Sequence, residues 1–184
     1  MSISKLILEA TCVIEIFVLL LIIWSVAFPP KRVWPPPSWT SIKFWVVWIC
    51  IVAIFFGLIY LAIDGFNSWQ LNAAIRYFLG LPVSLIGMLY AFWGIGVLGT
   101  KNSLGIQNQF ITRGPYRYCR NPQYMGDILL LMGAILFINP INFIVPAILA
   151  IIGFWLMPLP EEDWLEERYG EPYETYLNKT SRFI

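Results

Sequence analysis

The side chains best suited to chemistry are concentrated in two stretches, residues 113–127 (RGPYRYCRNPQYMGD) and residues 161–184, which begin EEDWLEERYG. The first contains three arginines and an Asn-Pro break before an apolar run, and the second opens with three carboxylates directly after another apolar run. Arg120 can orient an anionic group through charge-assisted hydrogen bonds, and Glu161 can accept hydrogen bonds from hydroxyl or ammonium groups. Because both stretches adjoin apolar runs, we expect them to form one polar site at a membrane surface.

The residue types exclude several other chemistries. The 184 residues contain no histidine, which removes zinc-hydrolase, haem and histidine acid/base chemistry. The three cysteines are scattered and are interpreted as reduced, small apolar residues. No basic surface is long enough to follow a nucleic acid. We therefore expect neither a metal site nor a nucleic-acid partner.

The composition is typical of an integral membrane protein. Hydrophobic residues make up 59% of the chain and charged residues 12%, which leaves too little polar surface for a water-soluble globule. The apolar runs occupy so much of residues 1–184 that we expect a single membrane domain. Its predicted fold class is all-α, with about five transmembrane helices and a short C-terminal helical tail.

Apolar runs of bilayer-spanning length place the helices. The expected spans are residues 6–28, 43–63, 76–99, 124–138 and 141–157. The last two are joined at Asn139-Pro140 and are either two short spans or a hairpin with a shallow tip. Residues 29–38 are rich in proline and are expected to form a stiff, non-helical connector. Residues 6–28 lack a basic leader and a small-residue cleavage site, so we expect a retained helix.

Two features inside the spans predict local environments. Glu15 lies about halfway along the first span and must face the bundle or a watery cavity. It is either a substrate or proton contact, or a protonated or hydrogen-bonded packing residue. Ser84, Gly87, Ala91 and Gly94 form a stripe of small residues on one helix face. Such a stripe favours close packing against a neighbouring helix.

The basic residues predict the orientation. With five spans, ten of the twelve lysines and arginines fall on one side and only Lys5 and Arg76 on the other. The positive-inside rule then places the first loop, the third loop and the C-terminus in the cytosol. The tail is expected to form a helix that ends near Gly170, with an aromatic face that lies on the membrane or on the preceding loop.

The two polar stretches resemble a known family. GPYRYCRNPQYMG, followed after an apolar hairpin by EEDWLEERYGEPYETYLNKTSRF, resembles the isoprenylcysteine carboxyl methyltransferase family and, more broadly, membrane methyltransferases that include phospholipid N-methyltransferases. Their shared pattern is G-x-Y, R-H-P-x-Y-x-G, a hairpin, E-E-x-x-L-x-x-x-F-G-x-x-Y-x-x-Y and a closing P-R-F. The resemblance spans roughly residues 101–183.

The resemblance implies an S-adenosylmethionine site in residues 100–184, the cofactor-binding and catalytic half. Residues 1–99 would form the three N-terminal spans. It implies that the pocket is built from Asn108, Gln109, Phe110, Ile111, Tyr116, Asn121, Pro122, Gln123, Tyr124 and Glu161. Glu161 would accept from ribose hydroxyls or an ammonium, and the tyrosines offer aromatic faces. Gly126 is expected to let the helix backbone approach the ligand. No glycine-rich Rossmann fingerprint is present, which fits a pocket made from helix ends.

The reaction implied is methyl transfer to a lipid or small hydrophobic acceptor that arrives from the bilayer, among membrane lipids. Arg120 and Glu161 are the candidate catalytic residues. Arg120 either orients an anionic group or is an interfacial arginine that extends to the membrane surface. Positioning and exclusion of water are expected to carry the rate.

The sequence departs from the family pattern at three positions. Asn121 replaces the histidine of R-H-P, Ser181 replaces the proline before Arg-Phe, and Met157 stands where prenylcysteine enzymes have a basic residue. Two alternatives are an NADPH-dependent sterol or steroid reductase, suggested by NPQYMGD, and a phospholipid N-methyltransferase. Glu161 argues against the reductase because it would repel the extra phosphate of NADPH. A non-catalytic scaffold would not explain two polar motifs on one side of the membrane.

Overall fold

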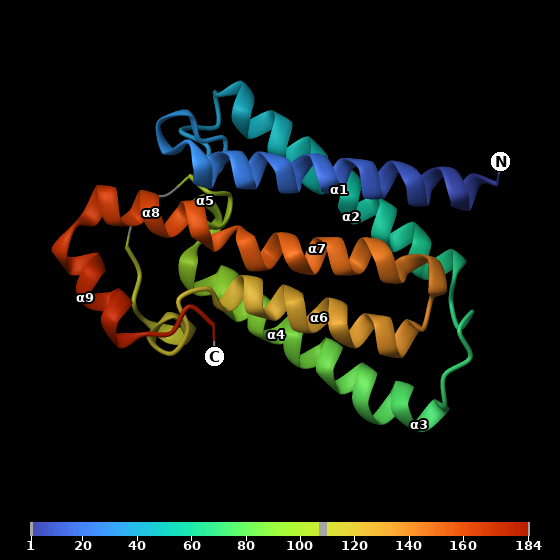
Figure 1. The fold of residues 1–184 in the computed structure, drawn as a ribbon. Coiled ribbons are helices and arrows are strands. Elements are labelled where there is room, and N and C mark those ends of the chain that lie inside the picture. The colour runs from blue at the N-terminus through green and yellow to red at the C-terminus, as the bar shows by residue number, and fades with distance from the viewer. Residues whose placement is uncertain (1, 107–109, 184) are drawn as a thin grey trace.

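The computed structural model describes residues 2–106 and 110–183 and is a helical bundle (Figure 1). Four helical segments are long and apolar enough to cross a membrane, namely Ile3–Ala27, Ile42–Asp64, Ala73–Leu98 and Ile141–Tyr169. A shorter apolar helix, Pro122–Ile138, lies between the last two in sequence. This confirms an all-α integral membrane protein of about five crossing helices.

The main helices are α1 (Ile3–Ala27), α2 (Ile42–Asp64), α4 (Leu81–Leu98), α6 (Pro122–Ile138) and α7 (Ile144–Leu156). Short elements connect them or form the tail: α3 (Ala73–Ile75), a π-helical turn (Arg76–Gly80), α5 (Thr100–Ser103), α8 (Pro158–Tyr169), α9 (Glu171–Lys179), and 3-10 turns at Pro29–Lys31, Gly114–Arg117 and Ile141–Phe143. Residues 2–106 and 110–183 contain no β-strand, and their only bridge pairs Cys119 with Ser181.

Local chemistry sets the helix boundaries. Ser2 and Ser41 cap α1 and α2 by accepting backbone N–H groups of Lys5 and Lys43. Helix α6 begins two residues before the expected Tyr124 because Pro122 occupies its first turn, where a missing N–H costs nothing. It ends at Ile138 and is capped by Asn139, which adopts a left-handed conformation with φ 59° before Pro140.

Helices α4 and α6 pack with their backbones in contact. A Cβ atom built on Gly87 would lie 2.3 Å from the backbone nitrogen of Leu130, and one on Gly126 would lie 2.4 Å from that of Ala91. Ser84, Gly87, Ala91 and Gly94 are all buried on this face of α4. The predicted close packing of the small-residue stripe is confirmed. The expectation that Gly126 admits a ligand is wrong, because its open face is filled by α4.

The hairpin of α6 and α7 runs the length of the bundle. Its tip contacts the loop that follows α2, since Asn67 N donates to Ile138 O at 2.8 Å and Trp69 N donates to Asn139 O at 3.2 Å. That loop lies at the end of the bundle opposite the tail (Figure 1). Of the two alternatives for this hairpin, the structure favours two crossing helices over a shallow tip.

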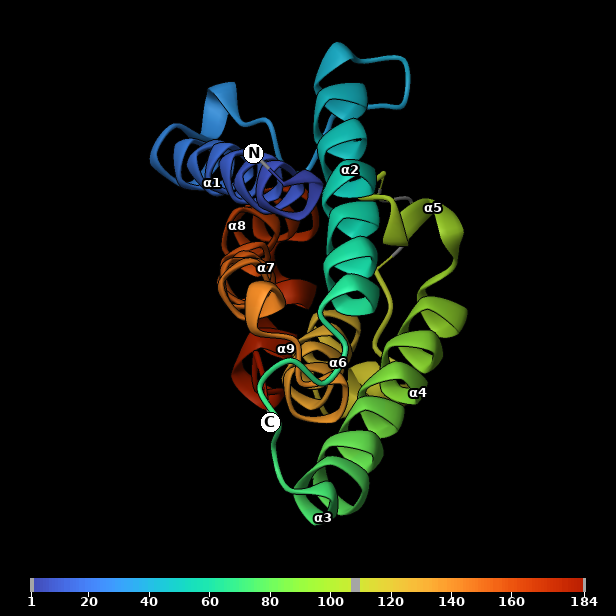
Figure 2. The same cartoon turned by 90° about the vertical axis from the view of Figure 1, so that its right-hand side faces the viewer.

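The polar segments gather at one end of the bundle. The connector after α1, helix α5, the Gly114–Arg117 turn and the tail helices α8 and α9 lie together there, whereas the N-terminus, α3 and the hairpin tip lie at the other end (Figures 1 and 2). This arrangement brings the ten basic residues predicted to share a side to the same end. Helix α8 begins at Pro158, and Gly170, with φ 56°, separates it from α9.

Candidate active site

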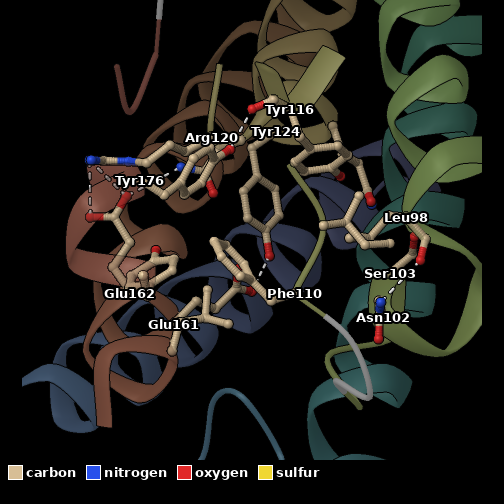
Figure 3. A pocket seen from close by; sticks show the side chains of 15 residues that line it. Leu98, Asn102, Ser103, Phe110, Tyr116, Arg120, Tyr124, Glu161, Glu162 and Tyr176 are labelled. Atoms are coloured by element: carbon tan, nitrogen blue, oxygen red, sulfur yellow. Dashed lines mark hydrogen bonds and ion pairs between the residues drawn. The ribbon is translucent and has the colours of Figure 1, made fainter. Parts of the chain in front are cut away.

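A polar cavity of about 70 Å³ lies where the tail folds back on the ends of α4 and α6. Figure 3 shows its side chains. The cavity is lined by Leu98, Asn102, Ser103, Phe110, Ile111, Tyr116, Arg120, Asn121, Gln123, Tyr124, Glu161, Glu162, Leu165, Tyr173 and Tyr176. Eight of these were expected from the sequence. Pro122 is buried in the first turn of α6 and does not line the cavity, whereas Asn108 and Gln109 lie outside the described residues.

Glu161 is anchored by two aromatic side chains. Its Oε1 accepts a hydrogen bond from Trp34 Nε1 at 2.7 Å. It accepts a second one from the Tyr124 hydroxyl, which Figure 3 shows. Trp34 is held in turn by Ser25, whose Oγ accepts the backbone N–H groups of Val33 and Trp34 at 2.9 and 3.1 Å. Only 9% of Glu161 is exposed. The carboxylate is thus held by hydrogen bonds from two segments, the connector after α1 and helix α6.

Glu162, the next residue, is bound by positive groups. It contacts Nη2 of Arg182 at 2.7 Å and Nη2 of Arg120 at 3.1 Å. Asn121 Nδ2 donates to it at 3.4 Å, and Arg120 Nη1 donates to Leu177 O at 3.1 Å. Hydrogen bonds to Glu162 are the first cause that raises the pKa of Arg182. Glu162 therefore joins the end of the chain to the Arg-Asn-Pro segment.

Arg120 is held inside the protein. Its side chain is only 11% exposed and is paired with Glu162, which favours the interpretation as a binding residue over that of an interfacial arginine. Its Nε atom is buried and has no hydrogen-bond partner within residues 2–106 and 110–183. Arg120 lines the cavity, where a ligand can provide the missing acceptor.

Aromatic rings close the cavity on the tail side. The Phe110 ring centroid lies 5.6, 5.5 and 5.3 Å from those of Tyr169, Tyr173 and Tyr176. Tyr176 also donates its hydroxyl to Tyr116 O at 2.6 Å. Of the two expected positions for the aromatic face of the tail, the structure shows the one against the preceding loop. Burial raises the pKa of Tyr116 and Tyr173, and nearby carboxylates raise it further, so both phenols stay neutral.

Behind the polar cavity lies a larger apolar cavity of about 390 Å³, enclosed mainly by α1, α2, α6 and α7. The two cavities have Ser103, Gln123 and Tyr124 in common as lining residues. Trp34, which holds Glu161, also lines the apolar cavity. A polar ligand and an apolar ligand bound in the two cavities would therefore share these three residues as a common wall.

Several residues of the site were missed by sequence reasoning. Trp34 lies in a segment interpreted as a plain connector, and Leu98 and Ser103 belong to no motif. Glu162, Tyr173 and Tyr176 belong to the recognised tail motif, but nothing in the pattern says that they face the cavity. The spacing of the two tyrosines by three residues was the available signal for their shared face.

The polar cavity fits S-adenosylmethionine in the chemistry of its walls. That ligand combines a sulfonium and an ammonium with a carboxylate, hydroxyls and an aromatic base. The cavity offers carboxylates for the cationic groups, Arg120 for the anionic group, and aromatic rings for the base. Ser103 Oγ and Arg120 Nε, both buried and unpartnered within the described part of the chain, are left for a ligand to satisfy.

Comparison with known families separates the methyltransferase from the reductase interpretation. The family model described as phospholipid methyltransferase matches residues 75–172, which is 98 of the 184 residues. The chain belongs to the phospholipid methyltransferase family. Membership indicates a membrane methyltransferase and favours that class over the NADPH-dependent reductase. Searches of curated proteins and of solved structures find no match.

Proposed function

We propose that this protein transfers a methyl group from S-adenosylmethionine to a lipidic or small hydrophobic acceptor. The observation that carries the proposal is the pair of adjoining cavities, one polar and one apolar, with Ser103, Gln123 and Tyr124 in their common wall. A water-soluble donor and a membrane-soluble acceptor need separate entrances that end at one point. Two cavities of contrasting polarity that meet at one wall provide this arrangement.

The polar cavity holds the donor. Glu161 accepts hydrogen bonds from its ribose hydroxyls or its ammonium, and Arg120 Nε binds its carboxylate. Phe110, Tyr116 and Tyr173 supply aromatic faces, with Ile111, Asn121 and Gln123 completing the walls. When bound, the cofactor supplies a methyl group activated by a sulfonium. Because the cavity of about 70 Å³ is small, the cavity must widen for the donor to enter.

The protein's own contribution is alignment and exclusion of water. Methyl transfer by in-line displacement needs little acid/base catalysis, so a fixed geometry carries the rate. Trp34 and Tyr124 hold Glu161 in place, and the ion pair with Glu162 holds Arg120. In this proposal Arg120 and Glu161 contact the donor, whereas Trp34 and Glu162 act as positioning residues.

The acceptor enters the apolar cavity from the bilayer and is not a prenylcysteine carboxylate. Met157, which replaces the basic residue of prenylcysteine enzymes, is 6% exposed and lines the apolar cavity. No lysine or arginine lines that cavity within the described residues. A carboxylate acceptor would therefore find no cation beside it, and a neutral or amine-bearing acceptor is favoured.

The site faces the cytosol in this proposal. The distribution of ten basic residues at the end that carries the site, against two at the other, supports that orientation. Residues 1–184 act as one membrane domain, in which residues 100–184 form most of the site. Trp34, from the connector after α1, and Leu98, from the end of α4, complete it.

Transfer of label distinguishes the acceptors. Purified protein is incubated with methyl-labelled S-adenosylmethionine, once with a membrane lipid extract and once with a farnesylated cysteine analogue. We expect labelled product from the extract and little or no methyl ester on the analogue. Rapid ester formation that survives Arg120→Ala would show that the inference from Met157 is wrong.

A further inference from the structure

The inward face of α1 carries a carboxyl group. The buried residues of this helix are Thr11, Glu15, Val18, Ile22 and Ser25. Because their spacing alternates between four and three residues, they lie on one face of the helix. Thr11 packs against α2, since a Cβ atom built on Gly57 would lie 2.2 Å from its Oγ1. Glu15, one turn further along, therefore points into the bundle.

Glu15 lacks a partner in the described part of the chain. The residue is 2% exposed, and both carboxyl oxygens are buried without a hydrogen-bond partner within residues 2–106 and 110–183. It takes part in no ion pair there either. A buried polar group without a partner is costly, so proteins seldom keep one unless a ligand or water satisfies it. Glu15 lines the apolar cavity, and a ligand in that cavity can provide the partner.

Glu15 is distant from the wall that the two cavities share. It precedes Ser25 by ten residues, which is about 15 Å along α1. Ser25 accepts the backbone N–H of Trp34, whose indole donates to Glu161 at the polar cavity. Apart from indoles, the other polar side chains that line the apolar cavity belong to the wall or lie one helical turn from it, namely Ser103, Gln123, Tyr124 and Asp127. Glu15 is thus a separate polar point in the apolar part of the cavity.

The surroundings of Glu15 favour its uncharged form. Its neighbours on α1 that line the cavity, Val18 and Leu19, are apolar, and no lysine or arginine is among the described lining residues. A carboxylate is poorly solvated in such surroundings and takes up a proton. The neutral carboxyl group then offers one O–H donor and one acceptor oxygen. A hydroxyl group matches it, because a hydroxyl accepts one hydrogen bond, donates another and carries no charge.

We propose that the apolar cavity binds an uncharged lipophilic alcohol whose hydroxyl group pairs with Glu15. The inference rests on the proposed function in taking this ligand as the methyl acceptor. The hydroxyl is recognised and is not methylated, because Glu15 lies about 15 Å along the helix from the level of the shared wall. The acceptor therefore has two polar groups, a hydroxyl at Glu15 and the methyl-accepting group at the wall. Glu15 lies outside the residues that the family model matches, 75–172, so this specificity belongs to the chain's own first helix.

Photolabelling tests the preference for a hydroxyl without methyl transfer. The probes are a diazirine-bearing dodecanol and the matched dodecane and dodecylamine. Each is added in equal amount to the full chain in phosphatidylcholine nanodiscs, and labelled peptides are identified by mass spectrometry. We expect the alcohol to label peptides of α1 and α2 roughly threefold to tenfold more than the hydrocarbon, the gain of a neutral hydrogen bond. Labelling by the amine should stay below that by the alcohol, because its charge is poorly solvated in the cavity.

Two substitutions separate hydrogen bonding from charge. Glu15→Gln keeps a donor and an acceptor but cannot ionise, so it should retain the preference for the alcohol. Glu15→Leu removes both and should reduce alcohol labelling to the level of the hydrocarbon. Glu9→Leu is the matched control, because Glu9 lies on the same helix, is exposed and pairs with Lys5. It should leave labelling unchanged. Thermal unfolding checks each fold, and Glu15→Leu should be at least as stable because it removes an unpartnered buried polar group.

Four results would overturn the proposal: equal labelling by alcohol and hydrocarbon, greater labelling by the amine, an alcohol preference that survives Glu15→Leu, or its loss in a folded Glu15→Gln. The first two need only the unsubstituted chain, so they hold even where a variant fails to fold. Calorimetric binding of S-adenosylhomocysteine to the same samples tests the proposed function separately. Selective alcohol labelling without S-adenosylhomocysteine binding would refute the methyltransferase site and leave the alcohol site standing. Binding of S-adenosylhomocysteine without selective alcohol labelling would do the reverse.

Discussion

Helix α6 is packed differently on its two sides. On one side it lies against α4 so closely that no Cβ atom fits at Gly87, Gly126 or Gly133. Facing α1, α2 and α7, it leaves a cavity of about 390 Å³. The first side is built from small residues that bring backbones together, and the second from large apolar side chains that keep helices apart. The same helix thus provides a fixed support and one wall of a binding site.

This difference has a counterpart along the sequence. The residues matched by the family, 75–172, include both α4 and α6 and most of the polar cavity. Glu15, Ile22 and Trp34, which line the apolar cavity, precede the matched region. We expect the packed pair to set the donor site and the earlier helices to select the acceptor.

The largest expected effect comes from Gly87→Leu, on the packed side. A Cβ at Gly87 would lie 2.3 Å from the backbone of α6, so the helices must separate. We expect a loss of at least about 3 kcal/mol in the free energy of unfolding. Chemical denaturation in detergent measures it. Gly96→Leu on the same helix is the control, since nothing lies within 4 Å of a Cβ there. Equal stability of the two variants would contradict the backbone contact.

Next in size is Glu162→Gln, which removes the charge that joins Arg120 and Arg182. We expect about 1.5 to 3 kcal/mol less stability, because these hydrogen bonds are charge-assisted and Glu162 is buried. The matched control is Glu167→Gln. Glu167 pairs with Arg32 but is 55% exposed, and exposed pairs contribute about 1 kcal/mol or less. A greater loss of stability in Glu167→Gln than in Glu162→Gln would show that the buried ion pairs of Glu162 are not the more stabilising ones.

Much of this comparison follows from the sequence. The stripe at Gly87 and Ala91 predicts the close pair, and apolar length predicts the crossing helices. The joining of the two motifs at Arg120 and Glu161 follows from an even number of crossings between them. Such features depend on local residue patterns or on the number of membrane crossings, and both can be obtained from the sequence directly.

Other parts depend on packing that no local pattern records. Trp34 reaches Glu161 across 127 positions in the sequence, and nothing in a proline-rich connector predicts that contact. Gly126 has the same sequence signal whether it faces a ligand or a helix. The roles of Glu161 and Glu162 separate only because adjacent helical residues point in different directions.

Glu161→Gln is expected to change affinity more than stability. Glutamine keeps an oxygen that accepts from Trp34 and Tyr124, so the pocket holds its shape. Loss of the charge should weaken S-adenosylmethionine binding by about 1.5 to 3 kcal/mol, or roughly tenfold to a hundredfold. Titration calorimetry compares it with Asp163→Asn, whose carboxylate is exposed and lines neither cavity. Similar losses in both variants would remove the case for Glu161.

The smallest effect on stability is expected for Gly153→Leu in α7, which faces the apolar cavity on the open side of α6. A Cβ at Gly153 meets only Leu19, at 3.8 Å, which is an ordinary contact. The rest of the side chain fills part of the apolar cavity, which Gly153 lines. We expect a change of about 1 kcal/mol or less in stability, intact donor binding and reduced methyl transfer. A loss of stability as large as that of Gly87→Leu would show that the two sides of α6 do not differ as described.

The central claim is that the polar cavity binds S-adenosylmethionine. Isothermal titration calorimetry of the detergent-solubilised protein, with S-adenosylhomocysteine and with NADPH in parallel, tests it most directly. We expect saturable binding of S-adenosylhomocysteine that is weakened by Glu161→Gln, and no binding of NADPH. Binding of NADPH alone would contradict the claim and point to a reductase.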